Sequence, residues 1–220
     1  PAPVPTPEPA TPLPVISPSP ISSRQVPSLE AVASGLEVPW AMAFAPDGRL
    51  FFTERPGRIR VIQQGKLLEE PVARLEVAAT GESGLLGLAL DPQFQLNGYI
   101  YVYYTYRDSA RGLKNRVERL TIKENKAGDS KVLLEGIPGN AIHDGGRLKF
   151  GPDGKLYITT GDSGTAQLSQ DLHSLAGKIL RLNPDGTVPQ DNPFSGSPVY
   201  SYGNRNSEGL AWQPGTGILF

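Results

Sequence analysis

One short pattern recurs four times in the chain and limits the folds open to it. Each copy has an apolar residue, then a turn that contains proline, then a strand of aromatic and β-branched residues; the copies fall at 44–54, 90–103, 150–159 and 212–220. Proline and glycine set the backbone angles of such turns. The chain also holds 25 glycines and 22 prolines, which favours many turns and short strands over helices. The repeat therefore predicts an all-β protein.

The spacing of the repeat indicates which all-β fold to expect. Its prolines, at 46, 92, 152 and 214, lie roughly one propeller blade apart, since a blade of four strands uses about 40–50 residues plus loops. Further strands are predicted between the copies, at 58–62, 117–122, 132–134 and 178–182. We expect a β-propeller of which about three blades and the start of a fourth are present.

The sequence stops at Phe220, inside the fourth copy of the repeat. A propeller removes its sheet edges by closing into a ring, typically of about 4–8 blades. We therefore expect the sequence to be the front portion of a longer protein, and the uncovered edges of this portion to favour aggregation.

The first thirty residues differ from the rest in composition. Proline stands at nearly every second position of residues 1–20, which is typical of an extended spacer without a core. We expect a proline-rich disordered linker over 1–30 and a partial β-propeller domain over 31–220. The linker favours an exported protein, either periplasmic, secreted or anchored to a surface; a disordered cytosolic tail is the alternative.

Charge and cysteine content exclude several kinds of partner and site. The 21 basic and 22 acidic residues nearly balance, so the chain shows no patch for nucleic acid and no signal for membrane insertion. It has no cysteine, which excludes disulfides and thiolate metal sites while leaving the redox compartment open.

The stretch 140–164 is the best candidate for chemistry. His143 precedes a predicted turn at Asp144, and Asp162 follows the strand predicted at 155–160, so both side chains are expected on loops, exposed at one edge of a sheet. A carboxylate that accepts one imidazole N–H fixes the tautomer of the ring and makes it a better base. In the alternative interpretation, His143 only bonds a turn and Asp162 only satisfies backbone N–H groups.

One or two helical turns are predicted near the second histidine. Leu168, Leu172 and Leu175 have helical spacing, and Gly177 is a plausible residue to end the helix. His173 falls on the opposite side of that stretch, so we expect it to be a solvated surface residue.

Six motifs resemble one known family, the soluble pyrroloquinoline quinone (PQQ)-dependent glucose/sorbosone dehydrogenases, and in particular their bacterial aldose sugar dehydrogenase branch. The resemblance covers about 32–220. The motifs are GLEVPWAMAF at 35–44, ERPGRI at 54–59, GESGLLGLAL at 81–90, His143 with GRL at 146–148, GKILRL at 177–182, and YGNRN at 202–206 with GLA at 209–211.

The resemblance implies an enzyme on a six-bladed propeller. Its substrate would be an aldose, oxidised at C1 to the lactone; His143 would take the hydroxyl proton while hydride passes to PQQ, and Asp162 would orient His143. Glu82, Arg205 and Asn206 match positions that contact the cofactor. Calcium ligands would lie beyond Phe220, so the fragment alone is expected to be inactive, and an external acceptor would receive the electrons.

Several positions depart from the glucose-oxidising members of the family. Ile142 replaces an aspartate, Glu82 a glutamine, Asn204 a histidine, and 207–208 a proline-glutamine pair, so the resemblance does not extend to glucose as the substrate. A carboxylate at Glu82 facing an anionic cofactor would need a proton or a nearby cation.

Other interpretations of these residues and of the chain stay open. Arg205 could pair with Glu208, Asn206 could be an ordinary turn residue, and Glu82 a solvated loop carboxylate. The domain could be a non-catalytic propeller that binds a protein or a glycan. A metal-dependent sugar lactonase would need several oxygen or histidine ligands converging at the axis. The sequence offers no clear cluster of that kind, so no metal ligand is assigned.

Overall fold

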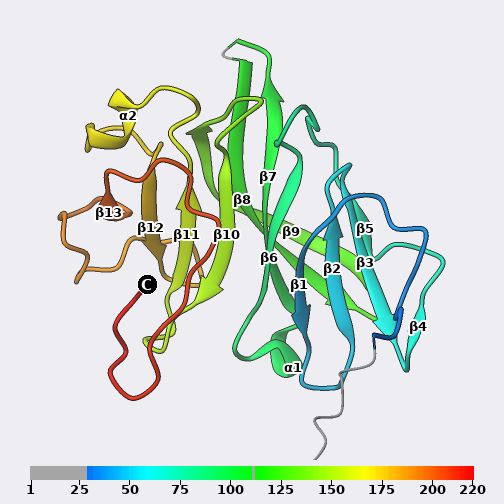
Figure 1. Ribbon diagram of the computed structural model, residues 1–220. Coiled ribbons are helices and arrows are strands. Elements are labelled where there is room, and N and C mark those ends of the chain that lie inside the picture. Colours follow the sequence, from blue (N-terminus) through cyan, green and yellow to red (C-terminus); the bar gives the residue numbers. More distant parts are fainter. Residues whose placement is uncertain (1–28, 111) are drawn as a thin grey trace, which may run out of the picture. The chain divides into compact units, whose positions relative to one another are not determined.

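The computed structural model describes residues 29–110 and 112–220 (Figure 1). By its internal contacts the chain divides into two units, Pro1–Ala31 and Val32–Phe220. The linker predicted for 1–30 lies almost entirely outside the described residues. Within them, no helix is long and apolar enough to span a membrane.

Three antiparallel sheets make up the unit Val32–Phe220, and together they are part of a β-propeller. The first contains β1 (Pro39–Phe44), β2 (Leu50–Glu54), β3 (Arg58–Gln63), β4 (Lys66–Leu67) and β5 (Ala73–Arg74), which pairs with β3. The second is β6 (Leu85–Leu90), β7 (Tyr99–Asp108), β8 (Gly112–Lys123) and β9 (Lys126–Pro138). The third is β10 (Gly145–Phe150), β11 (Leu156–Thr160), β12 (Lys178–Leu182) and β13 (Val199–Tyr202). This arrangement confirms the predicted blades.

The repeated turn has the same chemistry in the first and third blades. Asp47 accepts a hydrogen bond from the N–H of Arg49 at 3.1 Å, and Asp153 accepts one from Lys155 at the same distance. Gly48, the third residue of the first turn, has φ +87°, a conformation that glycine adopts without strain. These local bonds explain why the sequence pattern located the turns.

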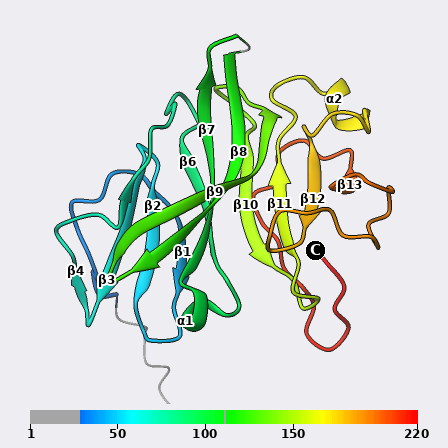
Figure 2. The ribbon, with the colours of Figure 1, turned by 180° about the vertical axis from the view of Figure 1, so that it is seen from behind.

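Apolar side chains fill the spaces between neighbouring blades, where β1 and β10 both pack against β6 (Figures 1 and 2). Between the first two blades, Phe51 and Phe94 meet edge to face with ring centroids 5.6 Å apart. Between the second and third, Tyr101 contacts Phe150 with centroids 5.1 Å apart. These contacts hold β1, β6 and β10, the innermost strands of the three blades, next to one another.

The helix predicted around 168–175 is shorter than expected. Helix α2 covers only Gln167–Gln170. Asp171 then bonds the N–H of His173 at 2.9 Å, a local bond that competes with helix continuation. Gly177 does not end the helix, because its N–H donates to the carbonyl oxygen of Gly161 and leads into β12. The prediction of Gly177 as the helix end was wrong.

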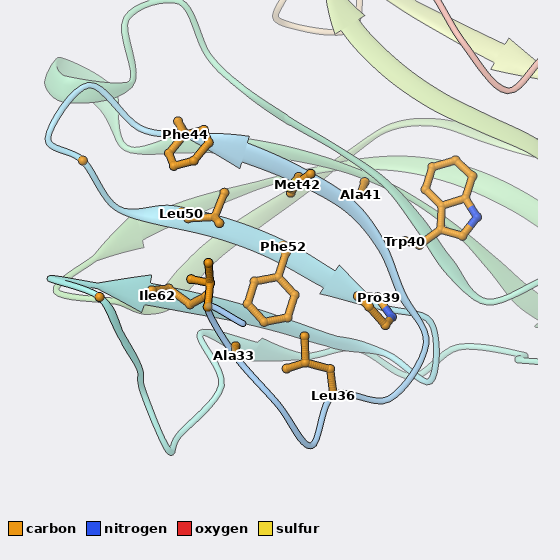
Figure 3. A pocket seen from close by; sticks show the side chains of 13 residues that line it. Ala33, Leu36, Pro39, Trp40, Ala41, Met42, Phe44, Leu50, Phe52 and Ile62 are labelled. Carbon is orange, nitrogen blue, oxygen red and sulfur yellow. The ribbon is translucent and has the colours of Figure 1, made fainter. Parts of the chain in front are cut away.

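One face of the first blade is apolar and open. A groove of about 600 Å³ runs over it, and Figure 3 shows the side chains from β1, β2 and β3 that line it. Met42 and Phe44 are 71% and 73% exposed there. An uncovered apolar sheet face of this kind favours association with another apolar surface.

The first prediction concerns the close approach of β6 and β10. A Cβ atom on Gly87 would clash with the carbonyl oxygen of Gly146, which is backbone and cannot move aside. We expect Gly87→Ala to destabilise the protein by about 1–3 kcal/mol, lowering the melting temperature by about 3–10 °C in a calorimetric scan. Gly128→Ala is the control, since a Cβ there meets only the oxygen of Thr121 at 3.7 Å. Equal melting temperatures for the two variants would contradict this account.

The second prediction concerns the open face of the first blade. We expect the 220-residue chain to self-associate at micromolar concentration, and Phe44→Glu to shift it towards monomer, because a charge in the groove must stay hydrated. Sedimentation velocity measures the change. Leu96→Glu is the control, since Leu96 is 85% exposed but lies outside the groove. If both variants dissociate the chain equally, this face is not the contact surface.

Candidate functional site

His143 and Asp162 form a direct hydrogen bond. Nδ1 of His143 lies 2.8 Å from Oδ1 of Asp162, and the two side chains are 14% and 5% exposed. The expectation that both are exposed was therefore wrong, since the neighbouring loops cover them. An ionised carboxylate only accepts hydrogen bonds, so in the neutral imidazole this bond puts the proton on Nδ1 and leaves the lone pair on Nε2. No described residue bonds Nε2, which leaves it available as a base.

The backbone of His143 is held from two sides. Its N–H donates to Oε2 of Glu82 at 2.8 Å, and its carbonyl oxygen accepts the N–H of Ser163 at 3.2 Å. Its φ is +58°, in the left-handed region that residues other than glycine seldom adopt. A Cβ on Gly161 would collide with the carbonyl oxygen of His143. Glycine at 161 therefore permits the approach that places the imidazole beside its carboxylate.

Asp162 makes both kinds of hydrogen bond that the sequence left open, one to the imidazole of His143 and one to a backbone N–H. Its Oδ1 accepts the N–H of Gly164 at 2.8 Å as well as the imidazole N–H. Its own backbone N–H donates to the carbonyl oxygen of Arg205 at 2.8 Å. The same residue thus fixes the orientation of His143, closes a local turn and ties β11 to the segment after β13.

The structure places Asn206 against the start of β10 and leaves the side chain of Arg205 without a partner among the described residues. Oδ1 of Asn206 accepts the N–H of Gly145 at 2.9 Å, and its Nδ2 donates to Glu208 at 3.1 Å. Asn206 is therefore more than an ordinary turn residue. The exposed guanidinium of Arg205 has no hydrogen bond or ion pair with the residues the structure describes, so the pairing of Arg205 with Glu208 is not formed.

Asp144 is a site residue that the sequence interpretation treated only as part of a turn. It is 2% exposed, and its Oδ1 accepts bonds from Nδ2 of Asn115 at 2.8 Å and from the N–H of Asn140 at 3.1 Å. Its Oδ2 is buried with no partner among the described residues. Burial raises the pKa of Asp144 to about 6. The sequence does not show that Asp144 is buried and hydrogen-bonded, because its partner Asn115 lies on a different blade.

A small cavity of about 250 Å³ lies beside these residues, at the ends of the innermost strands. Its lining includes three carboxylates, from Glu82, Asp144 and Glu208, and one cation, Arg55. Burial raises the pKa of Glu208 as well. Glu82 is not a purely solvated carboxylate, because it bonds the backbone of His143 and shares this cavity with a guanidinium. Among the described residues, no group of three histidines or carboxylates lies close enough to hold a metal ion.

The five residues predicted for the site thus come together, whereas His173 is exposed on the segment after α2. The arrangement can remove a proton from a bound hydroxyl group at Nε2 of His143. It also presents a free guanidinium that would attract an anion.

Comparison with known proteins identifies relatives that share this chain's fold. The PQQ-bound form of aldose sugar dehydrogenase from Streptomyces coelicolor is 41% identical, with a TM-score of 0.80 over 87% of this chain and 58% of its own. Quinoprotein glucose dehydrogenase B from Acinetobacter calcoaceticus is 35% identical over 86% of this chain and 47% of its own. Hedgehog-interacting protein from Mus musculus is 30% identical over 77% of this chain and 28% of its own.

The chain spans about half the length of the curated bacterial relatives that it matches. The family described as Glucose / Sorbosone dehydrogenase matches residues 36–220, which is nearly all of the part that carries the blades. The family predicted from six sequence motifs is therefore confirmed: this chain belongs to the glucose/sorbosone dehydrogenase family.

Proposed function

We propose that the protein oxidises aldose sugars at C1 to the lactone with PQQ as cofactor, and that this chain supplies the catalytic base. The observation that carries the proposal is the bond between Nδ1 of His143 and Asp162, which leaves Nε2 without a partner among the described residues. Relatives with sugar dehydrogenase names support the reaction class.

The residues present fit an anionic quinone. The guanidinium of Arg205 has no partner among the described residues, and Nδ2 of Asn204 is a buried donor that also lacks one. Buried donors without partners are uncommon, and an acceptor group on a ligand would satisfy this one. When bound, PQQ supplies the two-electron oxidation that amino acid side chains cannot perform.

Each of the five predicted site residues then has a separate task. His143 takes the proton of the C1 hydroxyl at Nε2, and Asp162 holds the tautomer that makes this possible. Glu82 fixes the backbone of His143. Asn206 positions Gly145, at the start of β10, and Arg205 is left to bind the negative charge of the cofactor.

Calcium and export complete the proposal on the strength of the family resemblance. Calcium would be held by residues other than those described, and the protein would act after export, as a periplasmic, secreted or surface-anchored enzyme.

A second candidate is a non-catalytic propeller that binds a protein. The similarity to Hedgehog-interacting protein favours keeping it, because that relative is named for an interaction and not for a reaction. Such a protein would need no free base, and its binding would be indifferent to replacement of His143. Among the described residues, no group of histidines and carboxylates is placed to hold the metal ion that a lactonase would need.

The first test is a titration of the complete gene product that carries this chain with PQQ and calcium, followed by a panel of aldoses. We expect saturable PQQ binding, followed by an absorbance change when sugar is added. His173→Ala should keep this absorbance change, and His143→Ala should lose it. His173 is a matched control, because it is exposed and its imidazole has no hydrogen bond to a described residue. Absence of PQQ binding would refute the enzyme and favour the binding protein.

A second test separates the roles of Asp162. Asp162→Asn keeps the size of the side chain but removes the charge that selects the Nδ1–H tautomer. By analogy with other carboxylate–histidine pairs, we expect kcat at saturating cofactor to fall by about 10²–10⁴-fold with little change in cofactor affinity. Asp185→Asn is the control, since Asp185 is exposed and its side chain bonds only Thr187 in its own turn. A kcat equal to that of the control would contradict the role.

A further inference from the structure

Lys178, the first residue of β12, is a buried cation without a carboxylate partner. Its side chain is 0% exposed. Its Nζ donates to the carbonyl oxygens of Leu168 at 2.8 Å, Ser169 at 3.0 Å and Ala176 at 2.6 Å. An ammonium has three N–H donors, so all of them are used. Burial lowers the pKa of Lys178, as expected for a charge removed from water.

The three oxygens belong to the irregular segment that follows Asp162. Residues 163–177 connect β11 to β12 and contain only the four-residue helix α2. Such a segment has few backbone bonds of its own, so its shape depends on side chains that pair its carbonyl groups. Lys178 binds the segment at two places, at 168–169 within α2 and at 176, and the hydroxyl of Thr160 donates to the carbonyl oxygen of Leu175 at 2.6 Å.

The residues that approach the base rest on the same segment. The carbonyl oxygen of Ser169, which Lys178 binds, also accepts the N–H of Gly203 at 2.8 Å. The carbonyl oxygen of Gly177 accepts the N–H of Asn204 at 3.0 Å. A continuous set of bonds therefore runs from the ammonium to the backbone immediately before Arg205.

We propose that Lys178 is a positioning residue: its ammonium acts as a fixed internal cation that holds 168–176 and, through it, residues 203–206 beside His143 and Asp162. The placement follows from the structure alone, and its consequence for cofactor binding rests on the proposed function. A lysine that only filled space would be replaceable by an apolar side chain of similar volume. Such a replacement would leave the carbonyl groups of Leu168 and Ala176 without the ammonium donor, and that of Ser169 with the N–H of Gly203 alone.

The test compares charge with volume in the complete gene product. Lys178→Met keeps the volume and removes the ammonium. Lys178→Ala leaves room for n-propylammonium, which restores the ammonium, or for 1-propanol, which restores the volume but not the charge. Val72→Ala is the control for general destabilisation, because Val72 is 3% exposed in the core between the first two blades.

Two readouts are measured, and the first needs no cofactor. Amide hydrogen exchange of Gly203 and Asn204 is expected to accelerate at least tenfold in Lys178→Met relative to Val72→Ala. In Lys178→Ala, n-propylammonium is expected to restore protection and 1-propanol is not. The dissociation constant for PQQ is expected to rise about tenfold in Lys178→Met while kcat at saturating cofactor changes less than threefold.

Unchanged protection of Gly203 and Asn204 in Lys178→Met would overturn the inference, as would equal rescue by 1-propanol. If Lys178→Ala does not fold, the comparison of Lys178→Met with Val72→Ala decides. Loss of protection in a protein that never binds PQQ would refute the proposed function and leave the positioning role standing.

Discussion

The close approach of Gly161 to the backbone of His143 is the constraint on which the rest of the site depends. Because no Cβ fits there, β11 can end directly against the loop that carries the base, and Asp162 falls within hydrogen-bonding distance of the imidazole. The positive φ of His143 is tolerated because Glu82 and Ser163 hold its N–H and carbonyl groups. The base is thus positioned by the backbone of its own blade, at Gly161 and Ser163, and by the side chain of Glu82 from the loop before β6.

Buried polar groups determine how the blades meet at the site. Asn115, on the second blade, bonds Asp144, which precedes the third; Tyr103 of the second blade donates to the carbonyl oxygen of Asp144 at 2.8 Å. Lys178 pairs the carbonyl groups of the long connection after Asp162. An unpaired buried donor or acceptor is costly, so each of these bonds favours one arrangement of the strands over others of similar packing.

The sequence predicted what depends on residues close together in the chain. The proline turns satisfy their own backbone groups through Asp47 and Asp153, so their pattern is visible without the fold. The pairing of His143 with Asp162 was also predictable, because the turns and the strand predicted between them bring both residues to one edge of a sheet. The bond of Asn206 to Gly145 and the burial of Asp144 were not, since each depends on residues far apart in the chain that only the fold brings together. The bonds of Lys178 and the early end of α2 are local, but the spacing of apolar residues does not show that a lysine ammonium is buried against backbone oxygens or that Asp171 bonds the N–H of His173.

Charge is divided between two parts of the site, and this division limits how a ligand can lie in it. The cavity lined by Glu82, Asp144 and Glu208 holds three acidic groups against one guanidinium. A group carrying carboxylates would be repelled there, whereas a sugar hydroxyl could donate to the unpaired Oδ2 of Asp144. Arg205, exposed and without a partner among the described residues, would instead attract negative charge.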